Sequence, residues 1–438
     1  MKRNRDGFQN ANVGLEHTDL AGFEEKVPET LKFTRSKQGL AARRIPIKIR
    51  AELQQYSTDK NKQMRFLIPN GTLLDFRKGY LQFDVTLAKT GGTYIRVHEG
   101  IFSLFDRLRI LANTSQCSDV RDWNRIYNAL WQMIQPAIVT QNIGVGLMGF
   151  GTQATRNAQG AITVTYICPI WSGLLNTELL PLDNINGGLQ LELYLGDPTT
   201  TIETDGTTPI VTISNPVLHC ERLELDVNYR RGMADYVRAN GLQLGFHTWD
   251  RYINQLTGGT QQNVNIQHRS SSLNAMLNIF VNAQELNNPA VNDKFIKWPT
   301  LNFASNQVIN NSQTFPDEPM DGTYAGFGEI YQMYCRWIMK WSLNGILTDA
   351  PPISWASFGG NAPIPAADAQ FVQIDDFEAY PEEMDLINPY TTMANNTTIM
   401  KKMNFSAPIP LNTYQLDTWA EFFQQATILS NGKVELLQ

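Results

Sequence analysis

Residues 101–134 read IFSLFDRLRILANTSQCSDVRDWNRIYNALWQMI, and two periodicities meet within them. Up to Leu111, apolar and polar side chains alternate, which is the period of a β-strand. From Val120 onward, the apolar positions fall three or four residues apart, which is the period of a helix. We expect Ser118 or Asp119 to cap that helix. The pattern predicts a strand that feeds a helix with a large apolar face, so a broad packed surface must surround both.

Large aromatic side chains mark this helix and one later segment. Trp123 and Trp131 lie eight residues apart, a little over two helical turns, and therefore share a side with each other. Core packing and a subunit interface both explain such residues. The candidate structural or interface aromatics are Trp123, Tyr127, Trp131, Trp337 and Trp341.

The totals favour a globular chain of two domains. The sequence has 438 residues, of which 42% are hydrophobic and 18% charged. A net charge of −6 argues against a protein that coats nucleic acid over its whole surface. No window approaches the ~20 apolar residues of a membrane span. The N-terminus lacks the apolar core of a secretory signal, which predicts folding in a reducing compartment.

The four cysteines are scattered, at positions 117, 168, 220 and 335. This spacing favours buried free thiols over a disulfide or a metal role. The five histidines show no zinc spacing either. We therefore expect no metal and no cofactor.

Residues 1–50 differ from the rest because basic side chains gather at both ends of the segment. The arm either docks on a partner, a membrane surface or nucleic acid, or is a solvated tail. The candidate contact residues are Lys2, Arg3, Arg5, Arg43, Arg44 and Lys48.

Beyond the arm, the chain has the pattern of two β-rich blocks. Short alternating stretches separated by turns predict strands at 64–69, 73–87, 161–170, 188–195 and 217–229 in the first block. In the second block they predict strands at 263–268, 272–283, 331–347 and 371–377, a short helix at 417–426, and two final strands that pair across Asn431-Gly432.

A connector separates the two blocks at residues 230–245, where a short helix should end at Asn240-Gly241. Many strands, long loops and little strand-to-helix alternation indicate an all-β protein of two sandwiches, with short helices in the loops between strands. The predicted division is a basic arm over 1–50, a first sandwich over 51–229 and a second over 246–438.

The sequence contains only weak matches to catalytic and nucleotide-binding motifs. Gly144, Gly146 and Gly149 match the spacing of a dinucleotide loop, but no βαβ pattern surrounds them, so a flexible loop is expected. Asp375, Asp376 and Glu378 resemble glycosidase carboxylates only in residue type, and we expect them to be solvent-facing acids at a strand end. No nucleophile elbow or P-loop occurs. An enzyme is therefore not expected.

Four pieces in order carry a family resemblance. They are GTLLDFRKGYLQF at 71–83, SLFDRLRI at 103–110, DVRDWNRIYN at 119–128, and SGLLN with LPL and GLQLEL between 172 and 193. This succession resembles the first half of double jelly-roll major capsid proteins of the tectivirus–adenovirus lineage, especially those of Polinton-like viruses and virophages. The resemblance covers about residues 65–230, and the second half matches only in length and strand pattern.

The resemblance implies two jelly-roll β-sandwiches side by side, and three copies that form a pseudo-hexameric capsomer of an icosahedral shell in a double-stranded DNA virus. It implies a structural protein of the virion, made inside the host cell and not secreted. Implied partners are the chain itself as a homotrimer, neighbouring capsomers, and penton and minor capsid proteins. The arm would face inward, toward an inner membrane or the genome.

Two other functions remain open from the sequence. The first is a β-sandwich protein that binds or processes carbohydrate, with exposed aromatics and Asp375-Asp376 as its site. The second is a structural protein that binds nucleic acid through the basic arm. Trimers or larger shells in solution would favour the capsid hypothesis over both.

Overall fold

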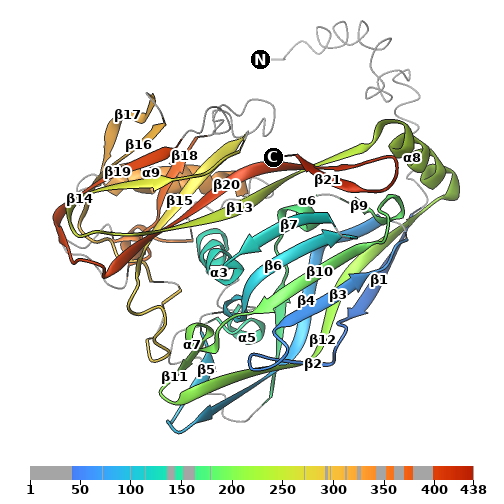
Figure 1. The fold of residues 1–438 in the computed structure, drawn as a ribbon, viewed down its shortest axis with the longest axis horizontal. Helices are drawn as coiled ribbons and strands as arrows, with labels where there is room; N and C mark the ends of the chain where they lie inside the picture. The colour runs from blue at the N-terminus through green and yellow to red at the C-terminus, as the bar shows by residue number, and fades with distance from the viewer. Residues whose placement is uncertain are drawn as a thin grey trace, which may run out of the picture.

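The computed structural model of the chain shows two β-sandwiches joined by a helix (Figure 1). It describes residues 42–71, 73–98, 100–113, 115–135, 144–150, 163–177, 179–270, 272–291, 294–295, 297–310, 313–322, 327–341, 352–359, 369–377 and 398–437. The blue-to-green first sandwich and the yellow-to-red second sandwich lie against each other, with helix α3 between them.

The first sandwich is built from two antiparallel sheets. One has the order β1-β12-β4-β8, with β2 and β9 at its margins, and the other has the order β3-β10-β6-β7. A two-stranded sheet of β5 and β11 stands apart. The strands are β1 (Ala42–Arg50), β2 (Gln55–Ser57), β3 (Gln63–Ile68), β4 (Leu73–Thr90), β5 (Ile95–Val97), β6 (Phe105–Ala112), β7 (Ser115–Arg121), β8 (Val164–Pro169), β9 (Leu180–Pro181), β10 (Leu189–Leu195), β11 (Ile202–Thr204) and β12 (Thr207–Leu225).

Short helices fill the connections of this sandwich. They are the 3-10 turns η2 (Ile101–Leu104) and η4 (Leu182–Asn184) and the helices α3 (Trp123–Ile134), α5 (Val145–Leu147), α6 (Gly173–Thr177) and α7 (Pro198–Thr201). Helix α8 (Val227–Asn240) then leads to the second sandwich, and Gly241 ends it with a φ of 73°. The predicted connector helix and its end at Asn240-Gly241 are confirmed.

The second sandwich repeats this design. One sheet has the order β13-β20-β15-β18, with β21 paired to β20, and the other has the order β14-β19-β16-β17. Its elements are β13 (Leu242–Gln255), β14 (Gly259–Ile266), β15 (Leu273–Asn282), β16 (Phe303–Asn310), β17 (Gln313–Asp321), α9 (Phe327–Trp341), α10 (Trp355–Phe358), β18 (Gln373–Asp376), β19 (Ile399–Ile409), β20 (Tyr414–Ile428) and β21 (Val434–Leu437).

The two sandwiches share one topology. In each, the entering strand pairs with the long closing strand, which in turn pairs with the next strand of the same sheet: β1-β12-β4-β8 corresponds to β13-β20-β15-β18. In each, a hairpin of the other sheet leads to an aromatic helix, β6–β7 to α3 and β16–β17 to α9. The predicted all-β chain of two sandwiches is therefore confirmed, and the duplication extends to the order of the strands.

Alternation along the strands produces the cores. In β4, Leu81, Phe83, Val85 and Leu87 are buried, while the residues between them are more exposed. One face of the sheet therefore packs against the opposite sheet of the sandwich, as the period-2 pattern predicts. The predicted final hairpin is also confirmed, because β20 and β21 pair, from Ile428 opposite Val434 to Gln425 opposite Leu437.

Residues 42–50 belong to the first sheet and are not part of an arm. β1 pairs with the end of β12, from Ala42 opposite Leu225 to Arg50 opposite Val217. Arg43, Arg44 and Lys48 therefore lie in a strand of the sandwich, in which Ile45, Ile47 and Ile49 alternate with Arg44, Pro46 and Lys48. Lys2, Arg3 and Arg5 lie outside the described residues.

Two predictions of secondary structure were wrong. The segment 331–347 was predicted as a strand, but residues 327–341 form helix α9, because its buried residues Ile330, Tyr334 and Trp337 follow the helical period. Asp417–Ala426 was predicted as a helix, yet it lies within strand β20. Residues Gln415 to Phe422 of this strand are all buried, so both of its faces are covered and the alternation disappears.

The predicted helix cap was wrong too. Ser118 and Asp119 lie in strand β7, and α3 begins at Trp123 after Asp122, whose side chain makes no cap hydrogen bond. Among the described helices, none combines the length and apolar character needed to cross a membrane.

Candidate functional site

The aromatic residues of helix α3 form a buried cluster on the side of the first sandwich that faces the second. Trp123 is fully buried, and its indole Nε1 donates to the carbonyl of Trp171 at 3.1 Å. The Trp123 ring packs edge-on against Phe102, and Trp131 stacks on Phe150 with ring centroids 5.4 Å apart. The strand-to-helix stretch of 101–134 therefore folds back on itself, with Phe102 of η2 against two aromatics of α3.

The equivalent helix α9 serves the second sandwich in the same way. Trp337 is fully buried, packs edge-on against Trp249 at 6.3 Å, and donates from Nε1 to Glu421 Oε2 at 2.9 Å. Trp123, Tyr127, Trp131 and Trp337 thus lie in the interior of the single chain. The side chain of Trp341 lies outside the described residues.

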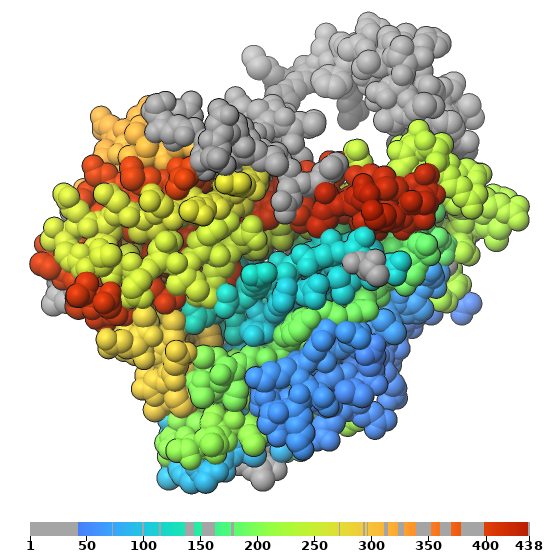
Figure 2. All heavy atoms as spheres, viewed as in Figure 1, coloured from blue at the N-terminus to red at the C-terminus, as the bar shows by residue number. Residues whose placement is uncertain are grey.

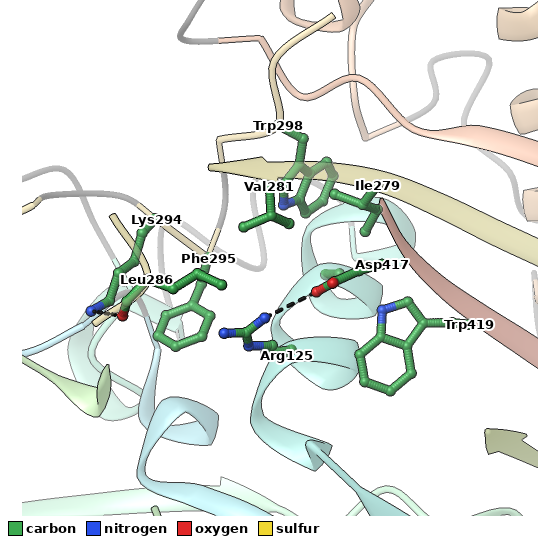
Figure 3. Close-up of a pocket in the computed structure, with 10 residues that line it drawn as sticks. Arg125, Ile279, Val281, Leu286, Lys294, Phe295, Trp298, Asp417 and Trp419 are labelled. Atoms are coloured by element: carbon green, nitrogen blue, oxygen red, sulfur yellow. Dashed lines mark hydrogen bonds and ion pairs between the residues drawn. The ribbon is translucent and has the colours of Figure 1, made fainter. Parts of the chain in front are cut away.

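An ionic centre joins the two sandwiches where α3 meets β13 and β20. Arg125 of α3 donates from Nη1 to Asp417 Oδ2 at 3.0 Å. Arg251 of β13 contacts the same oxygen with Nη2 and reaches Asp122 Oδ1, just before α3, with Nη1 at 2.8 Å. Figure 3 shows Arg125 pointing toward Asp417, with the Trp419 ring beside them. Two guanidinium groups are thereby balanced by two carboxylates.

Burial governs the electrostatics of this centre. Removal from water lowers the pKa of Arg125, and Asp417 and Asp122 oppose that shift. Burial also acts against the charge of Arg251, but the same two carboxylates outweigh it and raise its pKa. The Arg251 guanidinium also lies 5.4 Å from the Trp419 ring centroid, within cation–π range. Each charge has a partner, as a buried charge requires.

Backbone contacts extend this seam between the sandwiches on either side of the ionic centre. Tyr334 of α9 donates its hydroxyl to the carbonyl of Met133 at 3.0 Å. At Gly173 of α6, an added Cβ would lie 1.7 Å from the backbone oxygen of His247, so only glycine fits there. Lys294 Nζ, from the second sandwich, donates to the carbonyl of Thr199 in α7 at 3.4 Å. Two helices of the first sandwich therefore pack tightly on the second.

A small cavity lies in the seam beside the ionic centre. This cavity of about 20 Å³ is lined by Arg125, Lys294, Trp298, Asp417 and Trp419, among others, and has room for about one water molecule. That volume is too small for a substrate molecule. The contacts around the cavity act as a fixed joint: they set the orientation of one sandwich relative to the other.

The glycosidase-like acids lie in the core and not at a surface. Asp375 is fully buried and accepts hydrogen bonds from Lys401 Nζ at 2.5 Å and Asn306 Nδ2 at 2.8 Å. Asp376 is also buried. The prediction of solvent-facing acids was therefore wrong for both, and Glu378 lies outside the described residues. Within the described ranges, no group of three or more His, Cys, Asp or Glu residues could hold a metal ion.

The other sequence candidates are also part of the packing. Cys117, Cys168 and Cys220 are buried and Cys335 is half-buried, and burial raises the pKa of Cys117 to about 11. Helix α5 lies inside the glycine-rich stretch, and Phe150, which follows Gly149, is the stacking partner of Trp131. In β1, Arg44 pairs with Glu221 at 3.1 Å and with Asp75 at 3.4 Å on the sheet surface.

Sequence reasoning missed the ionic centre. Arg125 stands one position from the apolar stripe of α3, and Asp417 stands in a run that was predicted to be a helix. A charged residue beside the large aromatics was the available signal. The partner of each charge lies more than a hundred residues away in the chain, so spacing could not pair them.

Comparison with known proteins identifies the fold. No family model and no curated protein matches the sequence. Among solved structures, the PBCV-1 protein VP54, fitted into a reconstruction of the virophage Sputnik, superposes with a TM-score of 0.61 at 11% identity, covering 91% of this chain and 97% of that one. The Faustovirus major capsid protein gives 0.61 at 8% identity and coverages of 96% and 98%. The Sputnik virophage structure gives 0.57 at 11% identity, covering 90% and 88%.

These likenesses extend over nearly the whole of both chains, including the second half, which the sequence resemblance did not reach. The chain therefore has the double jelly-roll fold. It is the fold of the viral major capsid proteins to which its sequence pieces were compared.

Proposed function

We propose that this protein is the major capsid subunit of an icosahedral virus, and that three copies form a pseudo-hexameric capsomer. One observation carries the proposal: a single chain holds two sandwiches of identical strand order in a fixed orientation through a buried ionic joint. Six similar sandwiches can approximate a hexagon only if the two within each chain keep a constant angle. A mobile linker between them would not serve.

Closure of such a ring requires head-to-tail contacts between the first sandwich of one copy and the second sandwich of the next. Large apolar side chains are exposed on both. Leu53 and Leu67 lie on the first, and Ile253 and Leu411 on the second. We expect some of these residues to be buried between copies, because apolar area removed from water is the main source of association energy.

The remaining parts of the proposal concern location and partners. The protein would reside in the virion, after synthesis inside the host cell, and contact neighbouring capsomers, penton proteins and minor capsid proteins. Lys2, Arg3 and Arg5 would face inward, toward an inner membrane or the genome. The proposed role is structural.

Light scattering on the purified full chain tests the proposal. The capsid function predicts a species of three times the 49.5 kDa chain mass, or larger shells, and a hexagonal outline in electron micrographs. Leu67→Glu should weaken the trimer, since a charge would have to be buried in the contact. A wild-type chain that stays monomeric at micromolar concentration and binds glycans would overturn it in favour of the carbohydrate-binding alternative.

A further inference from the structure

Helix α8 is unusually exposed for its length. Of its 14 residues, only Val237 is buried. Val227, Tyr229 and Tyr236 are 57%, 46% and 54% exposed. Isolated helices of this size are marginal in water, and most of their stability comes from packing of an apolar face. The helix therefore has apolar surface available for a further partner.

A groove runs beside this helix. It has a volume of about 640 Å³ and lies between α8, residues 183–186 of the first sandwich and residues 429–432 at the turn before β21. Figure 2 shows the yellow-green α8 beside the red C-terminal hairpin. Ile185, Val237 and Leu429 add apolar side chains to a groove lining that is mostly polar.

Positive charge dominates the groove. Arg230, Arg231 and Arg238 line it, against a single lining acid, Asp183. Arg230 already pairs with Asp183 at 2.7 Å. Arg238 faces only the exposed Asp235 at 3.6 Å, and Arg231 has no ion pair among the described residues. Two cations of the groove are therefore available to an acidic ligand.

The N-terminal segment leaves the fold at this helix. Ala42, the first described residue, pairs with Leu225, and α8 begins two residues later at Val227. Residues 1–41 therefore start next to the N-terminal end of α8. The ten residues from 32 to 41 can span up to about 33 Å, more than the roughly 21 Å length of a 14-residue helix.

The middle of that segment complements the groove in charge and character. Residues 15–31 read LEHTDLAGFEEKVPETL, in which five carboxylates oppose one lysine for a formal charge of −4. Leu20, Phe23 and Val27 recur at three- and four-residue spacing, as on one face of a helix. Basic residues gather only before and after this stretch.

We propose that residues 15–31 dock in the groove beside α8 of the same chain. Their carboxylates pair with Arg231 and Arg238, and their apolar residues pack on the groove side of α8, beside Val227 and Ala234. The docked stretch anchors the N-terminal segment and leaves the basic tip with Lys2, Arg3 and Arg5 available to a separate partner. This inference does not depend on the capsid function.

Zero-length carbodiimide cross-linking of the full chain tests the docking directly. Arg231→Lys and Arg238→Lys keep the positive charge and add amines that couple to carboxylates. We expect mass spectrometry to find links from these positions to Glu16, Asp19, Glu24, Glu25 or Glu29. Arg121→Lys, at an exposed position on β7, is the matched control and should give no such links.

A mixture of ¹⁵N-labelled and unlabelled chains settles which copy supplies the segment. Links within one isotopic form support the proposal. Links between isotopic forms would overturn it in favour of docking on a second copy, and a yield no higher than in the control would overturn it altogether.

Hydrogen exchange on the otherwise native chain gives a second test that needs no groove substitution. Glu24→Gln with Glu25→Gln should speed amide exchange in α8 about fivefold, since surface ion pairs of this kind are individually weak. Lys2→Gln with Arg3→Gln is the matched control and should leave α8 unchanged. Equal exchange in all three proteins would contradict the docking.

Discussion

Arg125 Nη1, on a helix of the first sandwich, lies 3.0 Å from Asp417 Oδ2, in a strand of the second. Arg251 shares that oxygen and continues to Asp122. The two sandwiches are thus joined through buried charges that tolerate few alternative geometries, unlike apolar contacts, which can slide. The joint therefore specifies one relative orientation, which a subunit of a closed ring needs.

Asp417→Asn should destabilise the chain by about 3–5 kcal/mol, because it leaves two buried guanidinium groups with one carboxylate. Guanidinium chloride unfolding followed by tryptophan fluorescence measures this. Asp235→Asn is the matched control, since the Asp235–Arg238 pair is exposed and should contribute less than about 1 kcal/mol. Equal midpoints for both variants would show that the joint carries no stability.

Trp123→Ala should cost the first sandwich about 3–5 kcal/mol, because the ring is fully buried among aromatics and its indole is hydrogen-bonded. Thermal unfolding should show a lower transition. Tyr229→Ala, on the exposed face of α8, should stay within about 0.5 kcal/mol of the parent. A melting curve of Trp123→Ala that matched wild type would contradict the placement of α3 in the core.

Gly173→Ala should disrupt the packing of α6 on β13, because the new methyl group would overlap the backbone oxygen of His247. We expect a loss of stability and weaker assembly, measured by differential scanning calorimetry and light scattering. Gly232→Ala is the opposite case. Its Cβ would meet nothing within 4 Å, so α8 should gain about 0.5–1 kcal/mol from higher helix propensity. A neutral Gly173→Ala would refute the tight approach of the two sandwiches there.

Lys401→Met should cost about 3–5 kcal/mol, because Asp375 would remain buried without its counter-charge. Adding Asp375→Asn to the same chain should recover part of this loss, since the amide keeps hydrogen-bonding capacity but carries no charge. Urea unfolding of the single and double variants gives the coupling energy. Strictly additive losses would mean that the two groups do not interact as an ion pair.

Stability should rise with pH between about 4 and 6.5 through His268. Burial lowers the pKa of this histidine to about 4 from its ordinary 6.5. Over that window the unfolded chain binds a proton that the folded chain does not, so acid favours unfolding. Its Nδ1 lies 3.0 Å from the Tyr252 hydroxyl and its Nε2 lies 2.9 Å from Ser270 Oγ.

The titration of Asp106 changes the stability with pH in the direction opposite to that of His268, so the two effects must be measured separately. Burial raises the pKa of Asp106 to about 6 from 3.8, so the folded chain binds the extra proton and stability falls as pH rises through that range. His268→Gln removes only the first effect. We expect the stability difference between wild type and His268→Gln to grow from pH 4 to pH 6.5, and a constant difference would contradict the lowered pKa.

Local patterns predicted much of the fold. The alternation in 73–87 and the helical period in 123–134 are set by one buried face each, so they can be read from the residues alone. The two places where the pattern misled, 331–347 and 417–426, are a helix with many large aromatics and a strand buried on both faces. In these two segments, burial depends on other parts of the chain that pack against them. The spacing of apolar residues therefore no longer indicates whether the segment is a helix or a strand.

The sequence by itself determined that this is an all-β chain of two similar blocks linked by a helix, because turn residues and periodicity act over a few residues. Only the tertiary structure decided that Asp375 pairs with Lys401 in a core, that residues 42–50 close a sheet, and that Arg125 meets Asp417 across the seam. Each of these contacts joins residues distant in the chain. The energy of such a contact depends on the distance between its groups and on their burial in the folded chain. Neither quantity can be read from the local sequence.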